Sequence, residues 1–135
     1  MAKFKLSVVT PTGSVLDTDV FEATVPGAAG EFGMYADHQP ALIMLGGGLL
    51  SYQGVEDDGS VLIRGGVAEV GPQSLLILTD HAVLPENAER AEAEQLLEEV
   101  VATEAATDSL LDDDRVRKLA VNRGYAEALI KVAGH

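Results

Sequence analysis

The first 85 residues carry short runs in which apolar and polar positions alternate, the pattern of half-buried β-strands. In KFKLSVV, for example, Phe4, Leu6 and Val8 are separated by Lys5 and Ser7. Turn-forming sequences divide such runs: PTGS (11–14), PGAAG (26–30), GGG (46–48), EDDG (56–59), GG (65–66) and GPQ (71–73). Short strands at regular spacing are typical of antiparallel sandwiches and barrels. We therefore predict such a β domain for residues 1–85, with a turn at each of these sequences.

The pattern changes after Pro85, where alanine and glutamate replace glycine. Apolar residues then recur at the spacing of an amphipathic helix: Ala93, Leu96, Leu97, Val100 and Val101. Asn87 is a suitable N-cap for this helix. The sequence TDSLLDDD (107–114) interrupts the pattern. A second helix is expected to start among its last three aspartates, which suit a helix N-terminus, to run to about Val132 and to end at Gly134.

The second predicted helix carries apolar residues on two faces. One face holds Val116, Leu119, Ala126, Ile130 and Ala133, and the other holds Val121, Tyr125, Ala128 and Val132. One face can pack on the first helix, so the other needs the β domain or a partner protein. Two helices joined by a short loop form an antiparallel hairpin. The expected fold class is therefore α+β: an antiparallel β-sandwich in residues 1–85, then a two-helix antiparallel hairpin in residues 86–135.

Composition limits the classes of function. The formal net charge of −13 argues against a nucleic-acid partner, whose phosphates attract Lys and Arg. No apolar run reaches the length of about 18 residues that indicates a membrane-spanning helix. The N-terminal sequence lacks the features of a secretory signal, so the expected compartment is the cytoplasm. Cysteine is absent, which excludes disulfides and thiolate catalysis.

Residues with catalytic potential are few. His38 follows Asp37 and His81 follows Asp80, so these four side chains could form a metal site if the two segments met. The common spacings of metal ligands are missing, and no nucleophile, base and oxyanion donor occur together in a known motif. We therefore expect no catalytic site and no metal site. Two alternatives stay open here: a metal-dependent enzyme that uses His38 and His81, and a generic interaction module whose helices bind another partner.

Two stretches resemble the signatures of a known family. GAAGEFGMYADHQPAL (27–42) is similar to the G-x-x-GE-x-G-[apolar]-x-x-x-H-x-P-x-[apolar] signature of the ε subunits of F-type ATP synthases. LIRGGVAEVGPQSLLILTDHA (62–82) is similar to the second signature of their sandwich domain, and LSVVTPTGSVLDTDV (6–20) also fits. The two predicted helices agree with the family in length and order, so the resemblance covers essentially the whole chain.

The resemblance implies a sandwich of roughly ten short strands followed by a helix–loop–helix. It also implies a non-catalytic rotor subunit of the central stalk, bound to the γ subunit and to the ring of c subunits, that couples proton flow to ATP synthesis. Such a subunit lies at the cytoplasmic face of the bacterial cell membrane, as a peripheral protein held there only through the complex. In many members the helices extend toward the α and β subunits and block ATP hydrolysis.

The resemblance further implies a docking loop that faces the c ring and γ. Its candidate contact residues are Glu31, Phe32, Gly33, Met34, Tyr35 and His38. Glu31 would meet polar or basic groups, and the aromatic and methionine side chains would supply apolar contact area. A structural interpretation accompanies this one, in which Gly30 and Pro40 shape a turn and His38 satisfies a backbone group. The two interpretations are compatible, because a stiff loop loses little entropy on binding.

Some bacterial members bind ATP through an [apolar]-D-x-x-R-A motif on the first helix and two arginines four residues apart on the second. This chain reads NAERA at 87–91, and Glu127 stands four residues after Arg123. A glutamate repels phosphate, so Arg90 and Arg123 remain as candidate contacts for weak nucleotide binding only. No other cofactor is expected. Inhibition of hydrolysis is expected to rest on basic residues of the second helix, Arg115, Arg117 and Lys118.

Overall fold

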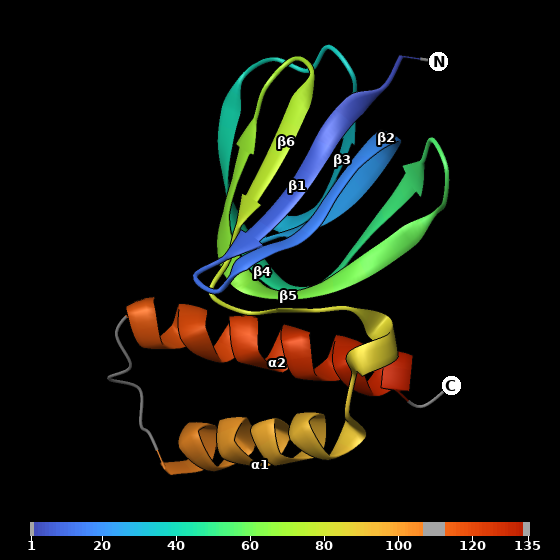
Figure 1. The fold of residues 1–135 in the computed structure, drawn as a ribbon. Coiled ribbons are helices and arrows are strands. Elements are labelled where there is room, and N and C mark those ends of the chain that lie inside the picture. Colours follow the sequence, from blue (N-terminus) through green and yellow to red (C-terminus); the bar gives the residue numbers. More distant parts are fainter. Residues whose placement is uncertain (1, 107–112, 134–135) are drawn as a thin grey trace.

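The computed structural model describes residues 2–106 and 113–133 and shows seven strands, one short 3₁₀ helix and two α-helices in them (Figure 1). In chain order these are β1 (Phe4–Thr10), β2 (Gly13–Gly27), β3 (Gly30–Tyr35), β4 (Ala41–Gly54), β5 (Gly59–Val70), β6 (Ser74–Leu78), β7 (Ala82–Val83), η1 (Pro85–Asn87), α1 (Arg90–Ala106) and α2 (Asp113–Ala133). Residues 107–112 of the predicted interruption at 107–114, and the predicted helix end at Gly134, lie outside the described residues.

The strands form a sheet that closes on itself into a sandwich (Figure 1). They pair in the order β1-β6-β5-β4-β2-β3, and β1 also pairs with the first half of β2. This additional pairing closes the circuit of β1, β6, β5, β4 and β2, which protects strand edges that would otherwise attract other chains. The pairs are antiparallel except that of β1 with β6, which is parallel. The prediction of a purely antiparallel sheet is therefore wrong at β1 and β6.

Three strands are longer than the turn-forming sequences suggested. β2 has 15 residues, β4 has 14 and β5 has 12, so fewer and longer strands replace the short ones that we expected. The predicted turns at Gly46–Gly48 and Gly65–Gly66 are wrong, because β4 and β5 continue through them. Gly65 and Gly66 have φ angles of 81° and 117°. Glycine adopts such angles at little steric cost, so β5 bends there instead of ending.

The alternation along the strands separates an inner from an outer set of side chains. The inner set forms the sandwich core: Phe4, Leu6, Val8, Val20, Ala23, Val25, Met34, Leu45, Leu50, Val61, Ile63, Ala68, Val70, Leu75 and Ile77. In β5, Val61 and Ile63 belong to this core, whereas Leu62 between them belongs to a second cluster with the helices. A single strand thus contributes to two apolar clusters.

The helices cover one end of the sandwich, and α2 lies between the sandwich and α1 (Figure 1). The second cluster joins them: Leu62, Ala93, Leu96, Tyr125, Ala126 and Leu129. This arrangement confirms that α2 uses one face for the first helix and another for the β domain. The prediction of Asn87 as the helix N-cap is wrong, because α1 begins at Arg90. Asn87 instead ends η1, and its amide donates a hydrogen bond to the carbonyl of Leu84.

Candidate functional site

The first part of the predicted docking loop is a strand. Residues Gly30–Tyr35 form β3, which pairs with the second half of β2. Because the side chains of a strand alternate between its two faces, Met34 is fully buried in the sandwich core. Met34 therefore has no surface to offer a partner, contrary to our expectation. Glu31 and Gly33 are exposed, and Tyr35 is 60% exposed.

The loop after β3, residues 36–40, is held in place by His38. The imidazole ring lies edge-on to Phe32, with 5.2 Å between the ring centroids. Its Nδ1 atom lies 2.8 Å from the carbonyl oxygen of Gln39. Both contacts support the structural interpretation of His38, and Phe32 is partly covered as a result. The more available aromatic side chain is Tyr35, whose pKa is raised by a hydrogen bond with Glu22 on the opposing strand.

Apolar side chains that sequence reasoning did not single out form a patch on the outer face of the sandwich. Met44, Val67 and Leu78 are 50%, 39% and 45% exposed. They lie side by side, since Met44 pairs with Val67 across β4 and β5 and Val67 pairs with Leu78 across β5 and β6. Leu42 and Leu76 lie two residues further along and flank Glu69. We call Leu42, Met44, Val67, Leu76 and Leu78 the outer patch.

The helices meet the sandwich through two glycines in close contact. A side chain on Gly47 of β4 would collide with the backbone carbonyl of Val121 in α2, and one on Gly124 of α2 would collide with the carbonyl of Gly47. The two backbones therefore touch without side chains between them. Glycine inside a helix weakens it by about 1 kcal/mol relative to alanine. This cost was a signal in the sequence that Gly124 has a packing role.

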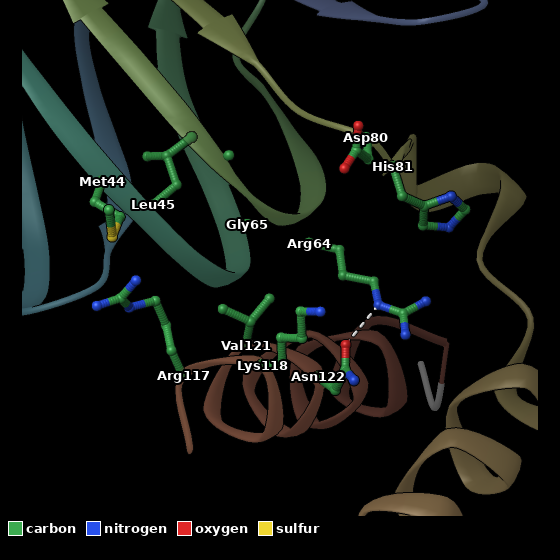
Figure 2. Close-up of a pocket in the computed structure, with 11 residues that line it drawn as sticks. Met44, Leu45, Arg64, Gly65, Asp80, His81, Arg117, Lys118, Val121 and Asn122 are labelled. Atoms are coloured by element: carbon green, nitrogen blue, oxygen red, sulfur yellow. Dashed lines mark hydrogen bonds between the residues drawn. The ribbon is translucent and has the colours of Figure 1, made fainter. Parts of the chain in front are cut away.

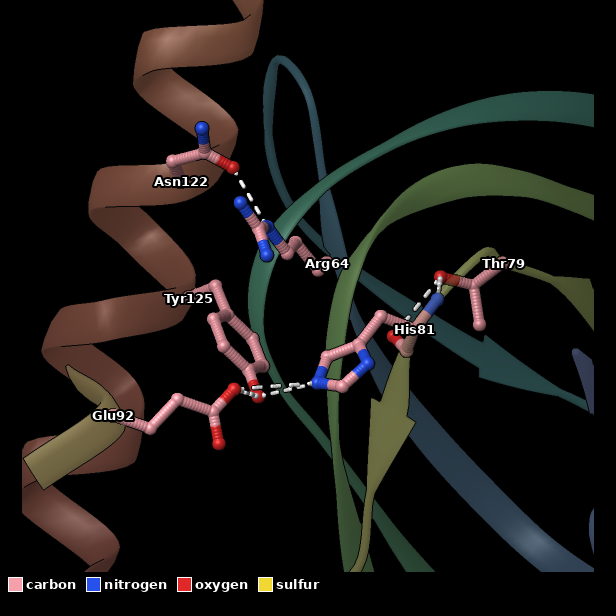
Figure 3. Close-up of polar contacts among 6 residues, drawn as sticks. All are labelled: Arg64, Thr79, His81, Glu92, Asn122 and Tyr125. Carbon is pink, nitrogen blue, oxygen red and sulfur yellow. Dashed lines mark hydrogen bonds and ion pairs between the residues drawn. The ribbon is translucent and has the colours of Figure 1, made fainter. Parts of the chain in front are cut away.

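A cluster of polar side chains fastens the same junction (Figure 3). The Nε2 atom of His81, between β6 and β7, lies 2.9 Å from the hydroxyl oxygen of Tyr125 in α2. That hydroxyl donates a hydrogen bond of 3.3 Å to Glu92 in α1, whose carboxylate also lies 3.5 Å from Nε2 of His81. Burial first, and then the charge of Glu92, raise the pKa of Tyr125. Its phenol therefore stays protonated and keeps its hydrogen for donation.

A second polar contact lies beside the first. Nε of Arg64 in β5 donates a hydrogen bond of 2.7 Å to the side-chain oxygen of Asn122 in α2 (Figure 3). The guanidinium carbon of Arg64 is 5.8 Å from the centre of the Tyr125 ring, within the range of a cation–π contact. Arg64 and Asn122 are separated by 58 positions in the chain. Only the fold brings them together, so no local pattern could have indicated this pair.

A cavity of about 460 Å³ opens next to these contacts, between the bent part of β5 and α2 (Figure 2). Arg64, Arg117 and Lys118 line it together with Asp80 and His81. Figure 2 shows the three cationic side chains directed to different parts of the cavity rather than to one point. The arrangement makes this side of an acidic protein locally basic, but it is not a preformed site for one anion.

The two candidate nucleotide contacts, Arg90 and Arg123, each form an ion pair within the helical domain. Arg90 pairs with Glu94 at 2.8 Å within α1. Arg123 of α2 pairs with Glu104 of α1 at 2.6 Å, and the hydrogen bond with Glu104 is the main cause that raises the pKa of Arg123. Glu127 lies 3.9 Å from the same guanidinium group. Both candidate nucleotide contacts therefore already have carboxylate partners.

The three predicted inhibitory residues lie in the first turns of α2. Arg115, Arg117 and Lys118 are exposed. Arg117 pairs with Asp114 at 3.7 Å on the same helix and also lines the cavity. The two histidines of the alternative metal site lie in separate surroundings, His38 against Phe32 and His81 against Tyr125. Across residues 2–106 and 113–133, no group of three or more His, Asp or Glu side chains is placed to hold a metal ion.

Comparison with known proteins decides the family. Residues 3–85 match the family model described as ATP synthase, Delta/Epsilon chain, beta-sandwich domain. The chain belongs to the ATP synthase epsilon-chain family. It is 29% identical over 136 residues to the ATP synthase epsilon chain of Granulibacter bethesdensis, and the match covers all of both chains. It is 37% identical over 83 residues to that of Caulobacter vibrioides, a match that covers 62% of this chain and 96% of the relative.

A solved structure supports the fold of this epsilon-family chain over its full length. The chain superposes with a TM-score of 0.73 on a chain of the Euglena gracilis mitochondrial ATP synthase, a structure of its OSCP, F1 and c-ring parts. The match covers 100% of this chain and 83% of that one, at 23% sequence identity. None of the helices in the described part of the chain is long and apolar enough to cross a membrane.

Proposed function

We propose that this chain is the non-catalytic epsilon subunit of an F-type ATP synthase and forms part of the central rotor. In this role it would bind the γ subunit and the c ring and help to couple proton flow to ATP synthesis. It would be peripheral, at the cytoplasmic face of a bacterial membrane, and held there through the complex. The family membership and the full-length match to a relative support this proposal.

The observation that carries the docking role is the outer patch. Exposed apolar side chains that adjoin on neighbouring strands indicate a protein contact more strongly than scattered ones do. Val67 and Met44 face each other across one strand pair, and Val67 and Leu78 across the next, so the patch is continuous. Glu69 supplies a charge within it. We propose that the outer patch binds γ, and that Glu31 and Tyr35 on β3, beside His38, face the c ring.

We also propose two domains, residues 1–85 for docking and 86–135 for regulation. The match to the Caulobacter vibrioides epsilon chain covers 96% of that relative but only 62% of this chain, a length close to that of the sandwich. A relative of that length supports a sandwich that works without the helices. In the helical domain, an antiparallel hairpin would extend toward the α and β subunits and inhibit hydrolysis through Arg115, Arg117 and Lys118. ATP would bind weakly at Arg90 and Arg123, since it must displace their carboxylate partners.

The docking proposal is tested by recovery of the complex from the membranes of the source cells with tagged full-length protein. The wild-type chain is expected to retain γ, the c subunit and the catalytic subunits in mild detergent. The double variant Met44→Ser/Leu78→Ser should lose more than tenfold of this recovery, because interface contacts concentrate in a few apolar anchors. Val55→Ser is the matched control, because Val55 is 43% exposed but lies outside the outer patch. Equal recovery of wild type and double variant would contradict the docking surface.

The regulatory proposal is tested by a chain that ends at Pro85. In the assembled complex this truncation should raise ATP hydrolysis if the helices inhibit it. The variant Arg115→Gln/Arg117→Gln/Lys118→Gln should reproduce most of the increase, since it removes the charges and keeps the helices. Unchanged ATP hydrolysis in both the truncated chain and the triple variant would contradict the inhibitory role of the helices.

A further inference from the structure

The cluster of His81, Tyr125 and Glu92 joins three separate elements of the fold. His81 precedes β7 on the sandwich, Glu92 lies in the first turn of α1 and Tyr125 lies in α2. Figure 3 shows the imidazole, the phenol and the carboxylate converging on one point. The Tyr125 hydroxyl is 2.9 Å from His81 and 3.3 Å from Glu92. A change in any one of the three groups therefore affects how the sandwich holds both helices.

The number of hydrogens fixes how this cluster is arranged. A phenol has one hydrogen to donate. If Tyr125 donated its hydrogen to Nε2 of His81, neither the phenol nor Nε2 would have a hydrogen to donate to the Glu92 carboxylate. If Nε2 carries its own hydrogen, His81 donates to the Tyr125 oxygen and Tyr125 donates to Glu92, so both contacts are satisfied. The geometry therefore selects the tautomer of neutral His81 that is protonated on Nε2.

Protonation of the remaining nitrogen, Nδ1, changes the charge of the cluster but not its hydrogen bonds. The imidazolium would then form an ion pair with the Glu92 carboxylate, 3.5 Å from Nε2. Asp80, the preceding residue, lines the adjoining cavity, and its carboxylate is directed away from the imidazole (Figure 2). Arg64 of β5 and Arg117 and Lys118 of α2 line the adjoining cavity and oppose the imidazolium.

Among these charged groups, Glu92 is the one whose contact with the imidazole is direct. Attraction between charges falls with distance, and solvent screens the more distant groups. Arg64 is also engaged by Asn122 and the face of Tyr125. The side chains of His81 and Glu92 are 41% and 43% exposed, so the gain from the ion pair is modest.

We propose that His81, Tyr125 and Glu92 form a proton-dependent clasp that fastens the two helices to the sandwich more tightly in acid than in alkaline conditions. The imidazole is the group that changes, because only its positive form can pair with a carboxylate. The sign follows from the charges: the positive form of His81 pairs with Glu92, and this attraction is lost as the pH rises. The clasp is a property of the isolated chain and does not rest on the proposed function.

Hydrogen exchange of the full-length chain measures the clasp, because it detects small populations of open molecules. The reporter is the amide of Leu96 in α1, and the internal control is the amide of Ile63 in the sandwich core. After correction for the intrinsic effect of pH on exchange, protection of Leu96 should be about two- to fivefold higher at pH 6 than at pH 8. Protection of Ile63 should not change in this comparison.

Two substitutions test whether this cluster causes the pH dependence. Glu92→Gln should abolish it, because the imidazolium then has no carboxylate partner. Glu94→Gln is the matched control on the same helix, since Glu94 pairs with Arg90 instead. His38→Gln controls for the other histidine that follows an aspartate. Equal protection of Leu96 at both pH values, or a pH dependence that persists in Glu92→Gln, would overturn the proposal.

Nitrogen NMR of the His81 ring provides a test that needs no variant. In alkaline solution, the neutral ring should show a hydrogen on Nε2 and none on Nδ1. The opposite tautomer would mean that Tyr125 donates to His81 and that the contact with Glu92 is not a hydrogen bond, which would overturn the arrangement. These measurements on the isolated chain stay valid if the chain fails to join a synthase, so the two proposals fail separately.

Discussion

The sandwich core and the junction with the helices are built from different contacts. The core is apolar and draws on six of the strands, with Phe4, Leu6 and Ile77 among its fully enclosed side chains. The junction combines a small apolar cluster with a backbone contact at Gly47 and Gly124 and with hydrogen bonds between part-buried polar side chains. Apolar cores resist local opening, whereas contacts rich in exposed polar groups open at lower cost. We therefore expect the junction with the helices to open while the sandwich core stays folded.

The largest effect on stability should come from substitutions of Leu62 and Ile63, neighbours in β5 whose side chains face opposite ways. Ile63→Ala removes apolar volume from the sandwich core and should lower the free energy of unfolding of the whole chain by about 2–5 kcal/mol. Leu62→Ala empties a site in the helix cluster and should mainly reduce the protection of α1 and α2. Chemical denaturation and hydrogen exchange together separate the two results. Similar loss of sandwich protection in both variants would remove the distinction between the regions.

A smaller effect is expected where the backbones touch. Gly124→Leu places a side chain against the carbonyl of Gly47 and should weaken docking of the helices by about 1–3 kcal/mol, the usual cost of overpacking. The sandwich itself should keep its melting temperature. The matched control is Gly33→Ala, because a side chain at Gly33 meets no atom within 4 Å. Hydrogen exchange of α2 reports the docking, and unchanged protection in Gly124→Leu would show that the close contact is dispensable.

The smallest effect should follow from the pair of Arg64 and Asn122. Asn122→Ala removes one partly exposed hydrogen bond and should cost about 0.5–1.5 kcal/mol of docking free energy. Arg64→Met removes the same bond and also the contact with the Tyr125 ring, so it should cost at least as much. Hydrogen exchange of α2 in both single variants and the double variant measures this pair. A loss of several kcal/mol would mean that polar contacts dominate the junction.

The sequence predicts the two-part organisation well because periodicity reflects burial. Alternation in residues 1–85 and the helical spacing of Ala93, Leu96 and Val100 each mark a surface that the fold buries. The pattern fails at Gly46–Gly48 and Gly65–Gly66, because glycine permits both a turn and a bent strand and local sequence does not separate them. The lengths of β4 and β5 depend on how the two strands pair with each other, and the sequence of one strand does not show this pairing.

The candidate sites were harder to predict for a related reason. The sequence signature around Glu31 identifies the family, but the alternation of β3 decides that Tyr35 is exposed and Met34 is buried. The clasp is less visible still, because His81 and Tyr125 are separated by 44 positions. Residues of the outer patch carry no motif at all. They form a continuous patch only because neighbouring strands place them side by side.

The residue at the position of Leu62 should indicate whether a related sandwich carries the two helices. This side chain is fully enclosed in the cluster that it forms with residues of both helices, while its neighbours Val61 and Ile63 belong to the sandwich core. A sandwich that works without helices would present the same position to water. We therefore expect small or polar residues there in short epsilon chains and apolar ones in long chains. The sandwich alone, residues 1–85, should be more soluble at high concentration with Leu62→Ser than with the native leucine.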